Sequence, residues 1–386
     1  MVNETGVRSY LDHAASSPMR PEAIEAMARE LGQPGNPSST HAAGRRARKA
    51  LEEARESIAA DLGAQPSEVI FTSGGTEADN LAVKGSWLAR RTGPAARNGI
   101  VTSTVEHPAV SKAAAAAVAE GAELVEVGVD ARGRVDLGEV ADVLSERIAV
   151  LSIQWANGET GVGQPVPELA ALAAGHDIWF HTDAVQALSS LPVDFAAAGA
   201  DLMSVTAHKI GGPVGVGALI ARKTVSPAAL GFGGAQERDL RSGTVPVALA
   251  LGFAAALRAT VSGRQLAARG YEQHRRRIVD LVRRIDGARL NGVAEGPAST
   301  INLSFSGLRS DDLLLLLDAE GIDVSAGSAC SAGVARPSAV LVAMGLSEQL
   351  ASGALRISFG HSTTDADVDR LLAVLPDAVR RARAAY

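Results

Sequence analysis

The chain has 386 residues, of which 46% are hydrophobic and 21% are charged, a balance typical of a globular protein and not of a disordered one. Its length exceeds the size at which one hydrophobic core stops growing, so we expect one large domain and a smaller one. The formal net charge of −6 argues against strong nucleic-acid binding, because neutralising phosphates requires clustered Lys and Arg in excess.

Targeting and redox signals are sparse. Residues 1–8 contain neither a basic segment nor an apolar one, which predicts a cytoplasmic protein without a secretion signal. The leucine run at 313–317 is flanked by aspartates and is too short to span a membrane, so we expect no direct membrane association. The single cysteine, Cys330, excludes intramolecular disulfides and offers no set of thiolates for a zinc or iron-sulfur site, so we expect no metal.

Strands and helices alternate through the first two thirds of the chain. After a short strand near Tyr10, helices are expected from Pro21 and over 44–62, joined by a turn-rich loop at 35–41. Seven strands follow in the pattern, with helices between most of them: 68–72, 100–104, 124–127, 148–154, 178–181, 202–205 and 217–221. This alternation predicts an α/β fold with a mostly parallel seven-stranded sheet between helices, whose active site lies beyond the carboxyl ends of the strands.

The carboxyl-terminal third has a different pattern. We expect a helix over 247–261, a separate arginine-bearing helix near Ile278, strands at 299–305, 322–324 and 354–359, and a last helix capped by Thr364. These elements predict a small α+β domain. The expected division is a large domain at 16–262 and a small one made of 1–15 and 263–386, with the cysteine loop at about 325–336.

Lys209 lies on a glycine-rich turn directly after the strand at 202–205. A lysine held at the end of a buried strand is placed to lose its proton and act as an amine nucleophile. By itself this motif is more typical of an ordinary loop lysine. Other residues must therefore decide whether Lys209 is a nucleophile.

Two further strand ends supply what a pyridoxal phosphate site requires. Asp183 follows the neighbouring strand and is suited to pair with a pyridine nitrogen, while Gly75 and Thr76 open a helix whose free amides suit a phosphate. A plain N-cap is the alternative for Thr76. Together with Lys209, however, these residues meet the three demands of the cofactor, a combination more specific than any one part.

His107 and Cys330 are the remaining candidate catalytic residues. His107 closes a strand, where it is suited to stack on the cofactor ring and move protons, although a histidine before proline is often a turn residue. Cys330 stands among small residues and glycines, which predicts a mobile loop with a reactive thiol, since a structural cysteine would be surrounded by large apolar neighbours.

Nearly the whole chain resembles the cysteine desulfurases of the iron-sulfur-assembly and nitrogen-fixation type, which are class V aminotransferases of the fold-type I pyridoxal phosphate enzymes. The matching stretches stand in the family's order and spacing: Leu-Asp-His-Ala-Ala at 11–15, Gly-Asn-Pro-Ser-Ser at 35–39, Thr-Ser-Gly-Gly-Thr-Glu-Ala-Asp-Asn at 72–80, Glu-His at 106–107, Asp-Ala-Val-Gln at 183–186, His-Lys at 208–209, Arg-Ser-Gly-Thr at 241–244 and Ser-Ala-Gly-Ser-Ala-Cys at 325–330.

The resemblance implies a role for each matching residue. Lys209 would bind the cofactor covalently and move the substrate's α-proton, Asp183 would pair with the pyridine nitrogen, and His107 would stack on the ring. Gln186 and Asn157 would also contact the cofactor. The phosphate would be held by Gly75, Thr76, Thr206 and His208, with Thr244 from a partner subunit. Arg356 would bind the substrate carboxylate with help from Asn36.

The implied activity converts L-cysteine to L-alanine and leaves a persulfide on Cys330, whose sulfur passes to an acceptor such as an iron-sulfur scaffold or a tRNA- or DNA-thiolating enzyme. A homodimer with composite active sites is implied as well. One position departs from the family: Gly158 replaces an asparagine that usually contacts the cofactor phenolate, a hydrogen bond worth about 1.5–3 kcal/mol. Selenocysteine cleavage or another β-elimination, and a non-catalytic sulfur carrier with a degenerate site, are the alternatives.

Overall fold

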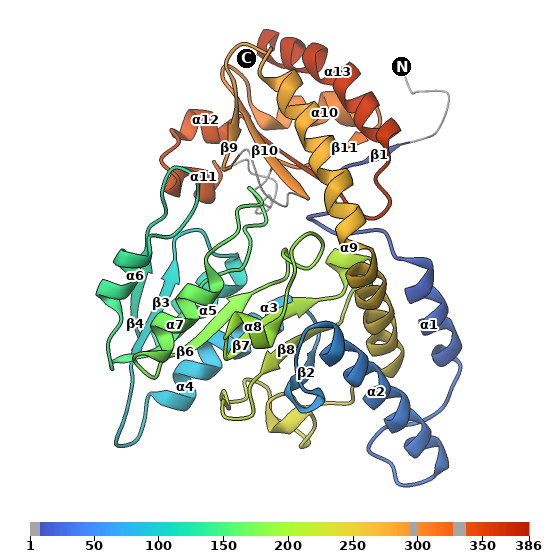
Figure 1. Ribbon diagram of the computed structural model, residues 1–386, viewed down its shortest axis with the longest axis vertical. Coiled ribbons are helices and arrows are strands. Elements are labelled where there is room, and N and C mark those ends of the chain that lie inside the picture. Colours follow the sequence, from blue (N-terminus) through green and yellow to red (C-terminus); the bar gives the residue numbers. More distant parts are fainter. Residues whose placement is uncertain (1–7, 294–298, 327–336, 386) are drawn as a thin grey trace.

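The computed structural model describes residues 8–293, 299–326 and 337–385, so Cys330 and its neighbours lie outside the described residues. Figure 1 shows a large sheet with its helices in the lower part of the molecule and a smaller sheet with its helices above it.

The large sheet has seven strands in the order β2-β8-β7-β6-β5-β3-β4. β8 runs antiparallel to β2 and β7, and the other neighbours are parallel. The mostly parallel seven-stranded sheet predicted from the alternation is therefore confirmed. Its strands are β2 (Val69–Thr72), β3 (Gly99–Ser103), β4 (Glu123–Val127), β5 (Ile148–Ser152), β6 (Trp179–Asp183), β7 (Leu202–Thr206) and β8 (Gly217–Ala221).

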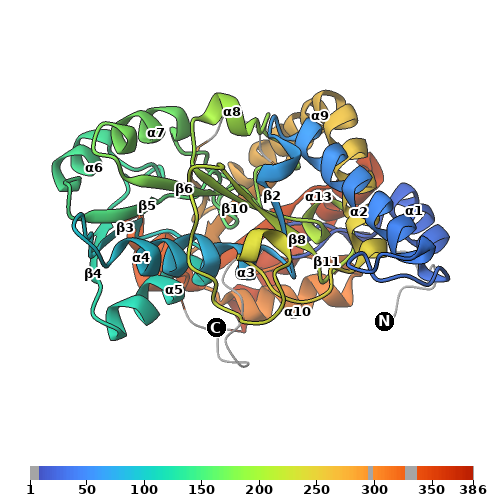
Figure 2. The ribbon, with the colours of Figure 1, turned by 90° about the horizontal axis from the view of Figure 1, so that it is seen from below.

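Helices cover both faces of this sheet. Figure 2 shows α6, α7 and α8 on one side of it and α3, α4 and α5 on the other. Successive side chains of a strand point to opposite faces, so Ile100 packs with α5 while Val101 packs in the core that includes α7. The helices are α1 (Pro21–Leu31), α2 (Ala42–Asp61), α3 (Gly75–Asn80), α4 (Ser86–Arg90), α5 (Pro108–Ala119), α6 (Leu137–Val143), α7 (Val166–Ala174) and α8 (Phe195–Ala198).

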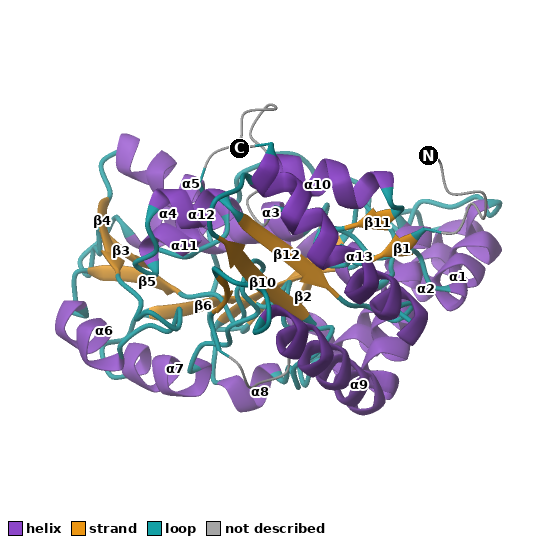
Figure 3. Cartoon of the chain, turned by 90° about the horizontal axis from the view of Figure 1, so that it is seen from above, coloured by secondary structure: helices purple, strands orange, loops and turns teal. Residues whose placement is uncertain are grey.

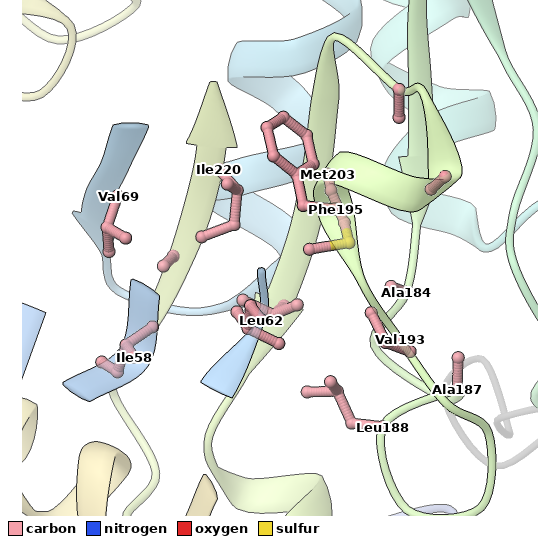
Figure 4. Packing of buried hydrophobic residues seen from close by; sticks show 14 of the residues in the cluster. Ile58, Leu62, Val69, Ala184, Ala187, Leu188, Val193, Phe195, Met203 and Ile220 are labelled. Carbon is pink, nitrogen blue, oxygen red and sulfur yellow. The ribbon is translucent and has the colours of Figure 1, made fainter. Parts of the chain in front are cut away.

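The main core lies between the large sheet and the helices of the α2 and α8 side. Figure 4 shows Ile58 and Leu62 of the α2 region and Phe195 of α8 meeting Met203 and Ile220 of the sheet. All five side chains are at most 2% exposed, so this layer fixes the positions of β7 and β8. The turn that carries Lys209 follows β7 directly.

A second core surrounds an antiparallel sheet of order β12-β10-β9 and a parallel pair, β1 with β11 (Figure 3). The pair joins the amino-terminal strand to the carboxyl-terminal third. The elements of this part are β1 (Ser9–Tyr10), β9 (Ala288–Asn291), β10 (Thr300–Phe305), β11 (Ile322–Asp323), β12 (Ala354–Ser358), α10 (Ser310–Ala319), α11 (Ala339–Ala343), α12 (Glu348–Ser352) and α13 (Asp365–Ala384).

One long helix, α9 (Val247–Val282), replaces the two helices expected near 247–261 and Ile278. Its first part packs in the main core through Phe253 and its last part in the second core through Ile278, so both ends are held while Gly263 is tolerated in the middle. The helix is long and apolar enough in one window to cross a membrane, but core helices of globular proteins pass the same test. The expected boundary at 262/263 falls inside α9, and the division into two domains stays a prediction.

Candidate active site

Lys209 lies in a short 3-10 turn, His208–Ile210, that follows β7. Its Nζ donates hydrogen bonds to the carbonyl oxygens of Ala14 (2.5 Å) and Ala15 (3.0 Å). Burial, and then the positive charge of Arg356, lower the pKa of Lys209 to about 8, although the carboxylates of Asp183 and Asp12 oppose the shift. An amine with a lowered pKa is a better nucleophile near neutral pH than an ordinary lysine.

Asp183 ends β6, beside Ser204 of β7 in the register of the sheet. Its Oδ1 accepts a hydrogen bond from the backbone N–H of Val185 at 2.9 Å. Burial raises the pKa of Asp183, while His107, the Val185 N–H and Lys209 oppose the rise. The Lys209 ammonium and the Val185 N–H near this carboxyl group favour its charged form.

His107 is the N-cap of α5, and its Nδ1 accepts a hydrogen bond from the N–H of Ala109 at 3.1 Å. Pro108 at the first helical position is compatible with this start, because proline lacks the N–H that would be left unpaired. Burial lowers the pKa of His107 from its ordinary value, so the ring is neutral near pH 7. Its nearest ligand atom lies within 4.8 Å of oxygens of Asp183 and Asp79.

The start of α3 lies at the same end of the sheet as Lys209, because Gly217 of β8 pairs with both Thr72 and Thr206. Helices leave their first N–H groups unpaired, and here these belong to the turn that begins at Gly75. A Cβ added to Gly75 would meet Val185 Cγ2 at 2.8 Å, so glycine is required for the close approach.

Thr206 and His208 flank this cradle from the other side. The Thr206 hydroxyl donates to Val216 O at 3.3 Å, and His208 Nδ1 lies 3.3 Å from the Ser16 hydroxyl. Burial and the charge of Lys209 lower the pKa of His208 to about 4. Hydroxyl, imidazole and helix amides are groups that hydrogen-bond phosphate oxygens, so the donors fit the phosphate of pyridoxal phosphate.

Gln186 occupies the space beside Gly158. A Cβ added to Gly158 would lie 3.1 Å from both Cγ and Nε2 of Gln186, which is tighter than ordinary packing. Gln186 Nε2 in turn donates to Ala14 O, the carbonyl that Lys209 also contacts. The carboxamide of Gln186 therefore lies beside position 158, where the family usually has asparagine. It shares the Ala14 carbonyl with Lys209.

Asn157 holds the turn that precedes α7. Its Oδ1 accepts bonds from the N–H groups of Glu159 and Thr160, both at 2.9 Å, and its Nδ2 donates to Val105 O at 3.1 Å. These contacts make it a turn-forming residue, and its expected contact with a cofactor stays a prediction.

Arg356 of β12 is 8% exposed and is fixed by two contacts: Nη2 with Asp12 Oδ1 at 2.8 Å, and Nη1 with Gly158 O at 3.2 Å. The Nε of Arg356 has no hydrogen-bond partner among the described residues. The positive charge of Arg356 is close enough to Lys209 to help lower the pKa of the lysine. Asp12, although part of a matched stretch, is a contact that sequence reasoning did not assign.

Asn36 and Thr244 lie elsewhere in the protomer. Both line a surface hollow of about 550 Å³ together with residues of α2 and of the segment near Glu237. In Figure 1 the loop between α1 and α2 is at the lower right, away from the sheet that carries Arg356. A single protomer therefore does not bring these two residues to Arg356, and both expected roles stay predictions, as does that of Cys330, which lies outside the described residues.

Two buried acids were not singled out from the sequence. Asp79 is 1% exposed and Glu106 is 8% exposed, and burial raises the pKa of Glu106 to about 8. Both belong to matched stretches, and the helix period that places Asp79 on the inner face of α3 is the signal that could have found it. Asp79, His107 and Asp183 are also residue types that bind metal ions, and the expectation of no metal stays a prediction.

Comparison with known proteins gives a consistent result. Residues 9–371 match the family described as Aminotransferase class-V. An "IscS-like cysteine desulfurase" of Mycobacterium tuberculosis is 48% identical over 384 residues, covering 98% of both chains. A solved "NifS-like protein" is similar with a TM-score of 0.89 at 33% identity, covering 97% of this chain and 100% of that one. A structure described as SspA in complex with cysteine has a TM-score of 0.78 at 31% identity, with coverages of 92% and 100%.

The fold, with its mostly parallel seven-stranded sheet and second antiparallel sheet, agrees with these neighbours over nearly the full chain. Identity of 48% extends through both sheets and is not confined to one motif. The chain therefore belongs to the class V aminotransferase family and, within it, to the cysteine desulfurases of the IscS and NifS type.

Proposed function

We propose that this cysteine desulfurase depends on pyridoxal phosphate and converts L-cysteine to L-alanine, with the sulfur captured on Cys330. The observation that carries the cofactor assignment is the half-buried Lys209 amine, whose pKa is lowered to about 8 near the carboxylate of Asp183. The structure described as SspA in complex with cysteine, a protein 31% identical to this chain, supports cysteine as the substrate.

The residues divide the work by position. When bound, pyridoxal phosphate acts as an electron sink for negative charge that develops on the substrate carbon. Lys209, neutral in a useful fraction near pH 7, binds the cofactor and then moves the α-proton of the substrate. Asp183, at the end of β6, would pair its carboxylate with the protonated ring nitrogen of the cofactor.

The neighbouring residues bind and orient. Gly75, Thr76, Thr206 and His208 would hold the phosphate at the start of α3, with Thr244 from the partner subunit of a homodimer. Gln186 and Asn157 would contact the cofactor ring. The imidazole of His107 would stack against the cofactor ring. Its Nδ1 accepts a hydrogen bond from the start of α5, so its Nε2 is the nitrogen that would exchange a proton with the substrate thiol.

Arg356 would bind the substrate carboxylate. Its guanidinium is already oriented by Asp12 and the carbonyl of Gly158, so little side-chain entropy is lost when an anion binds. Asn36 would reach this end from the partner subunit, because in its own protomer it lines a different surface hollow, together with residues of α2.

Sulfur transfer balances without an external oxidant. The Cys330 thiolate attacks the substrate sulfur, an S–S bond forms, and the C–S bond breaks with its electron pair remaining on the substrate carbon. A proton then replaces sulfur on that carbon and gives alanine. The outer sulfur of the persulfide then passes to a thiol of the acceptor, and Cys330 returns to its thiol form. An iron-sulfur scaffold or a tRNA- or DNA-thiolating enzyme has the right chemistry to accept it.

A cytoplasmic location stays a prediction.

The test is a single-turnover incubation of purified protein with L-cysteine. We expect one alanine per occupied site and a persulfide on Cys330 detected by mass spectrometry. Cys330→Ser should keep the visible absorption of bound cofactor and lose the persulfide, whereas Lys209→Ala should lose the covalently bound cofactor. Absence of alanine would contradict the proposal, and release of selenium from selenocysteine without turnover of cysteine would favour the lyase alternative. A protein that binds no cofactor would favour the sulfur-carrier alternative.

A further inference from the structure

Beneath the expected cofactor site, Asp79 and Asp183 form a buried carboxyl pair. One oxygen of each lies within 4.8 Å of the other and of a ring nitrogen of His107. The residues are 1% and 7% exposed. Two carboxylates this close in a dry environment repel each other strongly, so one of them retains a proton at neutral pH.

Asp79 has the poorer environment for a negative charge. Its Oδ1 has no hydrogen-bond partner among the described residues. The nearest base, His181, places Nε2 at 3.7 Å from that oxygen. Burial lowers the pKa of His181 to about 3, so the ring is neutral and does not supply the positive charge that an ionised Asp79 would need.

The hydrogen bonds of His181 are already assigned. Its Nδ1 lies 2.8 Å from the Ser152 hydroxyl and its Nε2 lies 2.9 Å from the Ser204 hydroxyl. If Ser152 donates to Nδ1, then Nε2–H donates to Ser204, whose own hydrogen is free to turn to Asp79. This hydrogen-bonded series of Ser152, His181 and Ser204 therefore brings no positive charge to Asp79.

The other elements that pack against α3 do not change this balance. β2 and β8 contain no titratable residue, and Lys112 of α5 is exposed. The segment before α5 brings Glu106, which is mostly protonated at pH 7 because burial raises its pKa to about 8, and His107, which is neutral, so neither supplies a positive charge to Asp79. Asp183 differs, because the Val185 N–H and the charge of Lys209 both stabilise its anion. Burial and Asp183 raise the pKa of Asp79 well above its ordinary value.

We propose that Asp79 is a positioning residue that keeps its proton beneath Asp183, next to Ser204 and His181, so that Asp183 is the single carboxylate facing the cofactor. The inference rests on the proposed pyridoxal phosphate site, and it adds a neutral acid on α3 as the reason why the charge is located at the end of β6. A negative charge on Asp79 would raise the proton affinity of Asp183 and weaken its partnership with a protonated ring nitrogen.

The first test is independent of the cofactor. Infrared difference spectra of the purified protein at pH 7, wild type minus Asp79→Asn, should show loss of the carbonyl band of a protonated carboxylic acid. Glu106→Gln is the matched control, since it should remove a second band of this kind. Loss of a carboxylate band in Asp79→Asn would overturn the proposal.

If Asp79→Asn does not fold, wild-type protein labelled with ¹³C-aspartate decides the question. A shifted carboxylic-acid band at pH 7 that persists in Asp183→Asn assigns the proton to Asp79, whereas absence of the band in wild type, or its loss in Asp183→Asn, refutes the proposal.

The second test uses the bound cofactor. Asparagine is neutral like the proposed acid, so the pH midpoint of the cofactor's visible absorption should agree between wild type and Asp79→Asn within about 0.5 unit. A larger shift would show that Asp79 carried charge. Asp183→Asn should shift the midpoint in the same assay. If the wild type has no visible band, the proposed function fails, while the infrared test still decides the protonation of Asp79.

Discussion

Replacing Arg356 by glutamine tests how the site activates Lys209. Arg356 lowers the pKa of the lysine, and its loss also releases Asp12, whose carboxylate raises that pKa. With a pKa of about 8, roughly a tenth of the amine is neutral at pH 7, against roughly one part in 3,000 at the ordinary lysine value. If Arg356→Gln raises the pKa by about one unit, the neutral fraction at pH 7 falls about tenfold.

The assay is the rate of covalent cofactor capture by the cofactor-free protein, followed by absorbance between pH 6 and pH 10. Because the neutral amine is the nucleophile, the rate should rise with pH and level off above the pKa of Lys209. Arg356→Gln should move the half-rise upward and converge with wild type at high pH, whereas Arg356→Lys, which keeps a positive charge, should move it less. A wild-type half-rise near pH 10, or identical profiles for wild type and Arg356→Gln, would refute the reasoning.

Three further predictions concern cofactor affinity and the stability of the fold. Gly158→Asn should displace Gln186 and change cofactor affinity more than Gly158→Ala does, because even one added carbon comes within 3.1 Å of Gln186; equilibrium titration with the cofactor checks this. Glu237→Gln should lower the free energy of unfolding by about 1–3 kcal/mol in urea titrations, because the buried Arg55 loses its partner at 2.7 Å and keeps only the more exposed carboxylate of Glu52 at 3.2 Å. Thr364→Ala should cost about 1 kcal/mol in the same titration by removing the capping box of α13, and no change would show that the cap is not formed.

The structure suggests a packing role for Gly158 that the sequence alone does not. As a sequence difference it indicates a lost hydrogen bond to the cofactor. In the structure, Gln186 lies against it at a distance that leaves little room for a side chain at 158. The two positions are coupled by packing, so a second substitution at Gln186 should change how Gly158 variants behave. Measuring both single variants and the double variant isolates this coupling.

Much of the fold could be predicted from local pattern. The alternation of apolar strands with helices located all seven strands of the large sheet, and the cap at Thr364 located the start of α13. Pattern was less informative for α9, where two helices were expected, near 247–261 and Ile278, and the structure has one continuous helix. β9 was missed because Ala288–Asn291 has one strongly apolar residue, and the strand exists through its pairing with β10.

The sequence by itself determined the candidate residues, because a lysine, an acid and a helix start at successive strand ends are local features. Tertiary structure decided which groups meet. The pairing of Arg356 with Asp12 joins positions 344 residues apart, and the closeness of Asp79 to Asp183 depends on how α3 packs against β7 and β8. Such contacts, and the pKa shifts that burial causes, follow from sheet register and packing, which local periodicity does not encode.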